Sequence, residues 1–211
     1  MYNFIDDLND YFCEEYANYD KLCVLPKYKM PVMQASKVRE DGRTYAYTLP
    51  AKTMRLAAQE EKAELLAELK TRMTDTTFSF SFRTRNLFFR IKDKFDKRAF
   101  YKMLGMILKK YGLSEAEAGE TLNVSPEIWK GICSGKFLPT KNLIMTLALT
   151  AHFSFDDTKT LLALCDYELD FKIVKDVVIS YLLTAKVYNP LMVEAALKEY
   201  KVDNLFFRKN A

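Results

Sequence analysis

The sequence predicts a mainly α-helical protein, in which a small α+β N-terminal region precedes an all-α domain. Three observations support this fold class. Apolar residues recur at helical spacing over most of residues 85–200, the pair Asp41-Gly42 separates two extended segments, and residues 77–83 (TFSFSFR) alternate strictly. A chain of 211 residues, of which 49% are hydrophobic, is long and apolar enough to bury a core.

Two helices and a short hairpin are expected in the first 74 residues. Residues 2–17 carry apolar side chains at helical spacing with acidic residues between them, which is typical of an amphipathic helix. The hairpin is predicted within residues 31–49, with strands at 32–38 and 44–49 on either side of the turn. Residues 52–74 are predicted to form a second helix, because leucines recur on one side of it.

The alternating stretch that follows places Phe78, Phe80 and Phe82 on one face of a short strand. We expect this strand to be buried against the hairpin, because its other face carries only Ser79 and Ser81. Three rings in a row can also stack on unpaired bases, and this alternative stays open.

Only helices are expected after residue 84. Their predicted ranges are 85–95, 98–111, 114–121, 125–133, 140–150, 156–165, 172–184 and 189–200. The change of pattern near residues 95–98 predicts an α+β N-terminal region (1–95), a helical domain (96–168) and a C-terminal helical hairpin packed on that domain (169–211).

Positive charge is concentrated in one part of the chain. The formal net charge is −2 for residues 1–76, +8 for residues 77–112 and −2 for residues 113–211. The upstream basic cluster consists of Arg83, Arg85, Arg90, Lys92, Lys94, Lys97 and Arg98. Such a cluster can neutralise phosphates. A solvated helix face, or a surface that docks on an acidic neighbour, explains the same residues and stays open.

Residues 113–135 (LSEAEAGETLNVSPEIWKGICSG) have the features of two short helices joined by a tight turn. Ser114 and Ser125 can cap the two helices, because a hydroxyl accepts hydrogen bonds from first-turn amides. Pro126 suits the first turn of the second helix, and Gly135 can end that helix. The stretch therefore predicts a helix-turn-helix.

Two further residues fit the crossing of the helices. Ala118 is small where they must approach, and Asn123 tolerates the left-handed conformation of a turn. The whole order resembles the lambda-repressor-like (XRE-type) helix-turn-helix family over about residues 100–164, and residues 166–207 resemble the helical extensions that follow such modules. The resemblance implies that residues 125–133 enter the major groove of duplex DNA.

The resemblance also implies which residues contact DNA. On the base side they are Glu115, Ser125, Pro126, Glu127, Trp129 and Lys130. The phosphate-side candidates come from the distribution of basic residues and are Arg83, Arg85, Arg90, Lys94, Lys97, Arg98 and Lys136. A tryptophan in this position is more often part of the core. Glu115 and Glu127 depart from the family pattern, and the motif is net negative, so phosphate attraction would have to come from the upstream basic cluster.

No catalytic or metal-binding motif is found in the sequence. Cys13, Cys23, Cys133 and Cys165 are widely spaced, which is typical of buried reduced thiols, and His152 at the end of an apolar helix is expected to be structural. Glycine-rich phosphate loops and nucleophile motifs are absent. We therefore expect no enzyme activity, cofactor or metal, and an unfamiliar active site would have to lie in residues 1–84.

Two functions fit these observations. The first is a prokaryotic transcriptional regulator that binds duplex DNA, as a homodimer on two half-sites. The second is a protein-binding adaptor or inhibitor with a degenerate helix-turn-helix, in a mobile-element, defence or toxin–antitoxin context. No apolar stretch is long enough to cross a membrane and the first ten residues are acidic, so a cytoplasmic protein without a membrane partner is expected.

Overall fold

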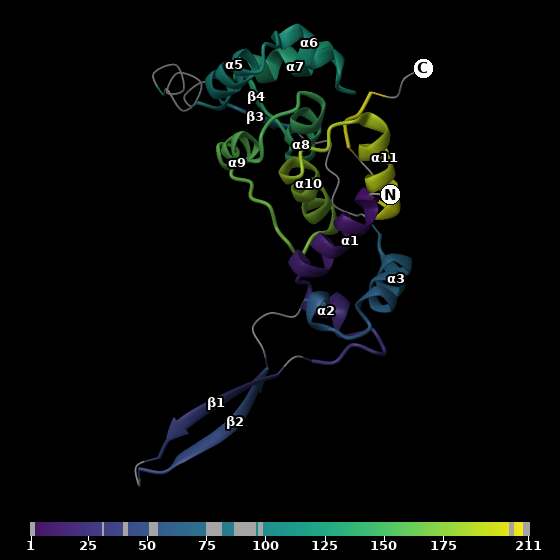
Figure 1. Ribbon diagram of the computed structural model, residues 1–211. Coiled ribbons are helices and arrows are strands. Elements are labelled where there is room, and N and C mark those ends of the chain that lie inside the picture. The colour runs from purple at the N-terminus through teal and green to yellow at the C-terminus, as the bar shows by residue number, and fades with distance from the viewer. Residues whose placement is uncertain are drawn as a thin grey trace. The chain divides into compact units, whose positions relative to one another are not determined.

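The computed structural model describes residues 3–30, 32–39, 42–50, 55–74, 82–86, 96, 99–202 and 205–208. The described residues are mainly helical, with a small two-stranded hairpin near the N-terminus, which confirms the predicted fold class at this level (Figure 1). Two compact units are present. The N-terminal unit comprises residues 1–74 and 170–177, and the helical unit comprises residues 75–169 and 178–211. The predicted three-region division stays a prediction, because most of residues 87–98 lies outside the described part.

The N-terminal unit is built from short helices around a small leucine-rich core. Its helical elements are α1 (Phe4–Glu15), α2 (Tyr19–Leu22), the 3₁₀ turn η1 (Leu56–Ala58) and α3 (Lys62–Arg72). Helix α1 contacts both η1 and α3, and Leu8, Phe12 and Leu65 are buried there. The side chain of Asn3 accepts a hydrogen bond from the amide of Ile5 (3.2 Å) and so caps α1. The expected helix at residues 2–17 is thereby confirmed.

The expected helix at residues 52–74 was too long. Helix α3 begins only at Lys62, and Gln59 has extended backbone angles. The cause is a pair of long-range hydrogen bonds: the amide of Lys29 donates to the side-chain oxygen of Gln59 (2.9 Å), and the side-chain amide of Gln59 donates to the carbonyl of Lys29 (2.7 Å). This pairing holds Gln59 extended and interrupts the helical pattern, and a partner 30 residues away leaves no local signal.

The predicted hairpin is present with almost the predicted ends. Strands β1 (Val32–Val38) and β2 (Thr44–Pro50) pair antiparallel, with Val38 opposite Thr44. The amide of Gly42 donates to the carbonyl of Arg39 (2.9 Å), and the amide of Arg39 donates to the carbonyl of Arg43 (2.9 Å). Gly42 has φ +80°. The two hydrogen bonds and this positive φ are typical of a hairpin whose three-residue connection ends in a glycine bulge.

The helical unit is organised around one buried helix. Its elements are β3 (Arg83–Thr84), α5 (Phe100–Lys110), α6 (Glu115–Glu120), α7 (Pro126–Cys133), β4 (Phe137–Leu138), α8 (Lys141–Thr150), α9 (Phe155–Ala163), most of α10 (Val174–Thr184) and α11 (Pro190–Glu199). All residues of α8 from 142 to 149 are buried. Figure 1 shows α5, α6 and α7 grouped near one end of α8. The helices predicted from residue 98 onward are confirmed to within a few residues, but the expectation of helices alone after residue 84 is wrong, because Phe137–Leu138 is a strand paired with β3. Of the first predicted helix, residues 85 and 86 are not helical, and 87–95 lie outside the described residues.

The expected packing of residues 77–83 on the hairpin is not what the described part shows. Residues 75–81 lie outside it, but β3 pairs antiparallel with β4, with Arg83 opposite Leu138. The sheet of β1 and β2 has two strands in the described part. The ring of Phe82 instead lies 5.9 Å from that of Phe206 near the C-terminus. Sequence alternation predicted a strand here, but it carries no information about the partner strand.

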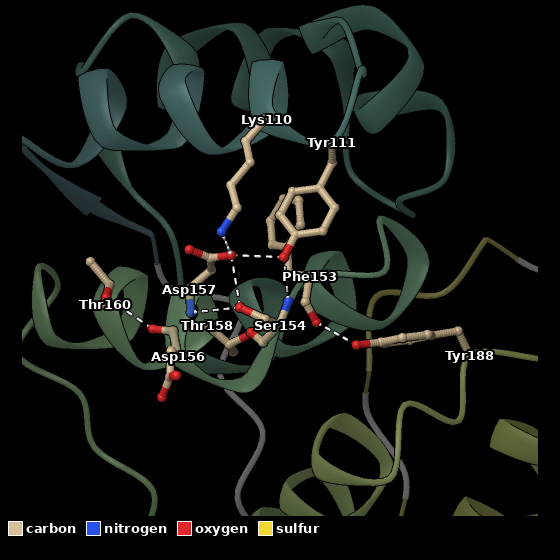
Figure 2. Close-up of polar contacts among 9 residues, drawn as sticks. All are labelled: Lys110, Tyr111, Phe153, Ser154, Asp156, Asp157, Thr158, Thr160 and Tyr188. Atoms are coloured by element: carbon tan, nitrogen blue, oxygen red, sulfur yellow. Dashed lines mark hydrogen bonds and ion pairs between the residues drawn. The ribbon is translucent and has the colours of Figure 1, made fainter.

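A half-buried polar cluster joins α5 to α9 (Figure 2). The hydroxyl of Tyr111 donates to the carboxylate of Asp157 (2.7 Å) and accepts from the amide of Ser154 (2.7 Å). The same carboxylate oxygen accepts from Lys110 (2.7 Å) and from the hydroxyl of Ser154 (2.7 Å), which also caps α9. Burial alone would raise the pKa of Asp157, but these hydrogen bonds and the lysine charge outweigh burial and lower it.

We predict that Asp157→Asn lowers the free energy of unfolding by about 1–3 kcal/mol at neutral pH, because it removes the charge that several donors share. The matched control, Asp156→Asn, changes an exposed carboxylate in the same helical turn and should cost about 0.5 kcal/mol or less. Urea unfolding at several pH values measures both.

The pH dependence has a definite sign. Because the folded pKa of Asp157 is depressed, its contribution is complete above the ordinary aspartate value of 3.8 and is lost as the pH falls through the folded pKa. The stability difference between wild type and Asp157→Asn should therefore shrink below about pH 4. A difference that stays constant with pH would contradict the role given to the carboxylate.

Candidate nucleic-acid interface

Helix α6 starts with the cap that the sequence predicts. The hydroxyl of Ser114 accepts from the amide of Glu117 (3.2 Å), and the carboxylate of Glu117 accepts from the amide of Ser114 (2.8 Å). This reciprocal pair is a capping box. The hydrogen bonds from the backbone and side chain of Ser114 lower the pKa of Glu117, so the start of α6 carries a stable negative charge.

Helix α7 presents a polar first turn to solvent. The hydroxyl of Ser125 accepts from the amide of Ile128 (3.3 Å), and Pro126 occupies the first helical position. Ser125, Pro126, Glu127 and Lys130 are exposed. Ile132, on the opposite side of the helix, is fully buried. The structure thus leaves these four predicted base-side residues accessible, and a fifth, Glu115 at the start of α6, is exposed as well.

Trp129 is not one of the accessible residues. Only 8% of it is exposed, and its indole N–H donates to the carbonyl of Glu115 at the start of α6 (2.7 Å). A Cβ added to Gly119 would lie 2.5 Å from the indole ring, so the ring rests on bare backbone. The prediction that Trp129 contacts a base edge is therefore wrong, and the alternative that it belongs to the core is confirmed. Gly119 is the residue that permits this close contact, whereas the close approach was predicted at Ala118.

The loop between α6 and α7 is held by the C-terminal segment, residues 205–208. The amide of Asn123 donates to the carbonyl of Phe206 (2.7 Å), and Leu122 forms an isolated antiparallel bridge with Phe207. Asn123 is not among the residues with positive φ, so the expected left-handed turn at this position is wrong. An isolated backbone bridge to the distant C-terminal segment sets the conformation of this loop instead. The end of α7 does follow the prediction, because Gly135 has φ +72°.

The exposed surface of α6 and α7, here called the α6–α7 face, is acidic. Glu115, Glu117, Glu120 and Glu127 are all exposed. The nearby cations Lys130 and Lys136 are exposed as well. Burial raises the pKa of the Cys133 thiol to about 12, and the neighbouring Glu115 carboxylate adds to the effect by its charge and by accepting a hydrogen bond. Cys133 is therefore an uncharged thiol at neutral pH.

The upstream basic cluster is described only at its first two residues. The guanidinium of Arg83 donates to the carbonyl of Cys165, lies 3.8 Å from the carboxylate of Asp166, and lies 5.1 Å from the ring centre of Tyr167. Arg83 therefore contacts the residues that follow α9. Its side chain remains 47% exposed, and its role at phosphates stays a prediction. The amide of Arg85 donates to the carbonyl of Lys136 (3.0 Å). The remaining phosphate-side residues, Arg90, Lys94, Lys97 and Arg98, lie outside the described residues.

The cysteines and the histidine form no reactive constellation in the described residues. Cys13 and Cys165 are buried, Cys133 is half-buried and Cys23 is exposed, so Cys23 departs from the expectation of buried thiols. His152 stacks on the ring of Tyr188 at 4.8 Å, next to the end of α8. Among the described residues, no group of three or more histidine, cysteine or carboxylate side chains could hold a metal ion.

The described helices are all too short or too polar to span a membrane. No protein-family model matches the sequence, and comparisons with curated proteins and with solved structures find no match.

The contact between Gly119 and Trp129 generates a stability prediction. We expect Gly119→Ala to lower the free energy of unfolding by about 1–3 kcal/mol, because the new methyl group overlaps a buried ring that is fixed by a hydrogen bond. The matched control is Gly105→Ala in α5, where a Cβ meets nothing within 4 Å and alanine favours the helix by about 0.5–1 kcal/mol.

Trp129 is the single tryptophan of the chain, so its fluorescence during urea unfolding reports on this contact. Gly119→Ala should unfold at lower urea than wild type, and Gly105→Ala at equal or higher urea. Equal midpoints for the two variants would mean that the ring does not rest on Gly119.

Proposed function

We propose that residues 99–165 are a lambda-repressor-like helix-turn-helix domain and that the protein binds duplex DNA as a prokaryotic transcriptional regulator. In this proposal α6 and α7 are the two motif helices, and α7 enters the major groove. The observation that carries it is the α6–α7 pair, in which Trp129 anchors the inner side of α7 while Ser125, Glu127 and Lys130 remain exposed on its outer side.

The exposed side chains suit direct reading of base pairs. Lys130 can donate to guanine, and Ser125 can donate or accept. Glu127 can accept a hydrogen bond from the amino group of cytosine, which makes its negative charge useful at a base edge even though it is unfavourable near a phosphate. A homodimer would repeat these contacts at two half-sites about one helical turn apart.

The start of α6 is less suited to a phosphate than in the family pattern. Two of the groups that would point at the phosphate, the amide of Ser114 and the amide of Glu117, are already bonded within the capping box. The Glu117 carboxylate lies at the same place. Because phosphate contacts supply much of the affinity, attraction must come from cations outside the α6–α7 face.

A second function, protein-binding adaptor or inhibitor, is favoured by the charge of this same face. Its exposed glutamates, Glu115, Glu117, Glu120 and Glu127, outnumber Lys130 and Lys136. An acidic surface of this kind would be complementary to a basic partner protein. The regulator requires binding that depends on base sequence, whereas the adaptor does not.

Selection of binding sites from a randomised duplex pool tests the first function. We expect the full-length protein to enrich a sequence motif with two half-sites. We expect Glu127→Gln to change the preferred base at one or two positions, by roughly 5- to 150-fold in affinity, because each base contact contributes about 1–3 kcal/mol of discrimination. The matched control, Glu168→Gln, removes an exposed carboxylate outside the face and should select the same motif as wild type.

A wild-type protein that enriches no motif would contradict the regulator. A nuclease-resistant partner from the native cell that is lost in Glu127→Lys and retained in Glu168→Lys would then support the adaptor.

A further inference from the structure

The hairpin of β1 and β2 carries an unusual combination of side chains that neither proposed function uses. Its described side chains are exposed on both faces of the ribbon, apart from the half-buried Ala35. A two-stranded ribbon that buries neither face gains little stability from its own packing. Its length and its surface therefore point to a use in binding.

All the described cations of the hairpin lie on one face. Residues opposite each other in an antiparallel pair share a face, so Lys37 lies with Tyr45, and Ala35 lies with Tyr47. Arg39 and Arg43 form the next pair beyond the strands, where the amide of Arg39 donates to the carbonyl of Arg43. We call this the basic–aromatic face.

Ring contacts confirm the grouping. The guanidinium of Arg39 lies 4.9 Å from the ring centre of Tyr45, and the rings of Tyr45 and Tyr47 are 5.9 Å apart. The two tyrosines are 37% and 38% exposed. The stacked guanidinium is held in place by the ring while its edge remains able to donate to an anion.

The other face has the opposite character. Its described side chains are uncharged: Gln34, Ser36, Val38, Thr44 and Ala46. Glu40 and Asp41 belong to the connecting loop and lie outside the described residues. Residues 32–50 carry three basic and two acidic residues, so the whole segment is nearly neutral. The positive charge is concentrated on one face of the hairpin.

We propose that the basic–aromatic face binds duplex DNA through its phosphates, with the ribbon lying along a groove. A two-stranded β-ribbon fits the major groove, and lysine and arginine on one face match the charge of the backbone. Duplex DNA is favoured over single strands because Arg39 already covers a face of Tyr45, which a stacking base would need.

This inference goes beyond the function proposed for α7 and does not require it. It assigns sequence-independent, salt-dependent affinity to the hairpin, whereas the proposal for α7 concerns base preference. It also supplies positive charge that the α6–α7 face lacks. The proposal for the hairpin can therefore fail while the proposal for α7 still holds, and the reverse.

The test measures binding of the full-length protein to a labelled duplex of mixed sequence by fluorescence anisotropy. The hairpin variant is Lys37→Gln/Arg39→Gln/Arg43→Gln. The control variant is Lys159→Gln/Lys186→Gln/Lys198→Gln, which removes the same charge from exposed positions of the helical unit. Circular dichroism and thermal unfolding check that both variants fold.

We expect the hairpin variant to bind at least roughly tenfold more weakly at low salt, and to lose up to about 2.7 from the slope of log affinity against log salt, because each phosphate contact contributes about 0.9. The control should lose less than about a third of that slope change. Equal effects of the two variants would overturn the proposal, and so would wild-type binding that does not depend on salt.

Two further binding measurements test whether duplex DNA is the ligand of the hairpin. A single strand of the same length that binds more tightly than the duplex, in a way that Tyr45→Leu abolishes, would overturn the duplex assignment in favour of base stacking. Poly-L-glutamate that competes as well as unlabelled duplex at equal charge would overturn nucleic acid as the ligand and indicate an acidic protein. Weak competition by polyglutamate and by the single strand is the expected result.

Discussion

The exposed surface of α6 and α7 depends on one contact, in which the ring of Trp129 rests on the bare backbone of Gly119. The indole N–H donates to the carbonyl of Glu115, so the ring is fixed both in position and in orientation. With Trp129 turned inward, helical periodicity turns Glu127 and Lys130 outward. A larger side chain at Gly119 would separate the helices, and the outer turn of α7 would no longer have a defined direction. The candidate interface is thus a consequence of core packing.

Long-range contacts complete this arrangement. The C-terminal segment pairs with the loop between α6 and α7 through Asn123 and Leu122, and the amide of Phe206 donates to the hydroxyl of Thr146 in the buried helix α8 (3.1 Å). Tyr111 and Asp157 tie α5 to α9 in a similar way. The short helices α6 and α7, which would be marginal alone, are therefore held by tertiary contacts on several sides.

The sequence predicted features whose cause is local and missed those whose cause is distant. The caps at Ser114 and Ser125, the end of α7 at Gly135 and the ends of the hairpin depend on neighbouring residues, and all are present. Gln59 breaks a predicted helix because of Lys29, and the loop at Asn123 is set by Phe206. No local pattern encodes such partners. For the candidate site, exposure of the first turn of α7 followed from periodicity. The contact of Arg83 with the residues after α9 did not, because its partner lies far away in the sequence.

Any function of the protein must account for two surfaces of opposite charge. The α6–α7 face is negative, whereas one face of the hairpin carries Lys37, Arg39 and Arg43. A DNA-binding protein built this way would separate its two tasks, with attraction to phosphates supplied by one element and reading of bases by another. A protein-binding adaptor would use the acidic face as the contact surface.

The most direct test of the central claim is an NMR titration of the full-length protein with a duplex obtained by binding-site selection. We expect the amide signals of Ser125, Glu127 and Lys130 to shift on binding, while the indole N–H signal of Trp129 stays in place because it remains bonded to Glu115. Shifts of the Trp129 indole without shifts at Glu127 and Lys130, or no shift in α7 at all, would contradict the account.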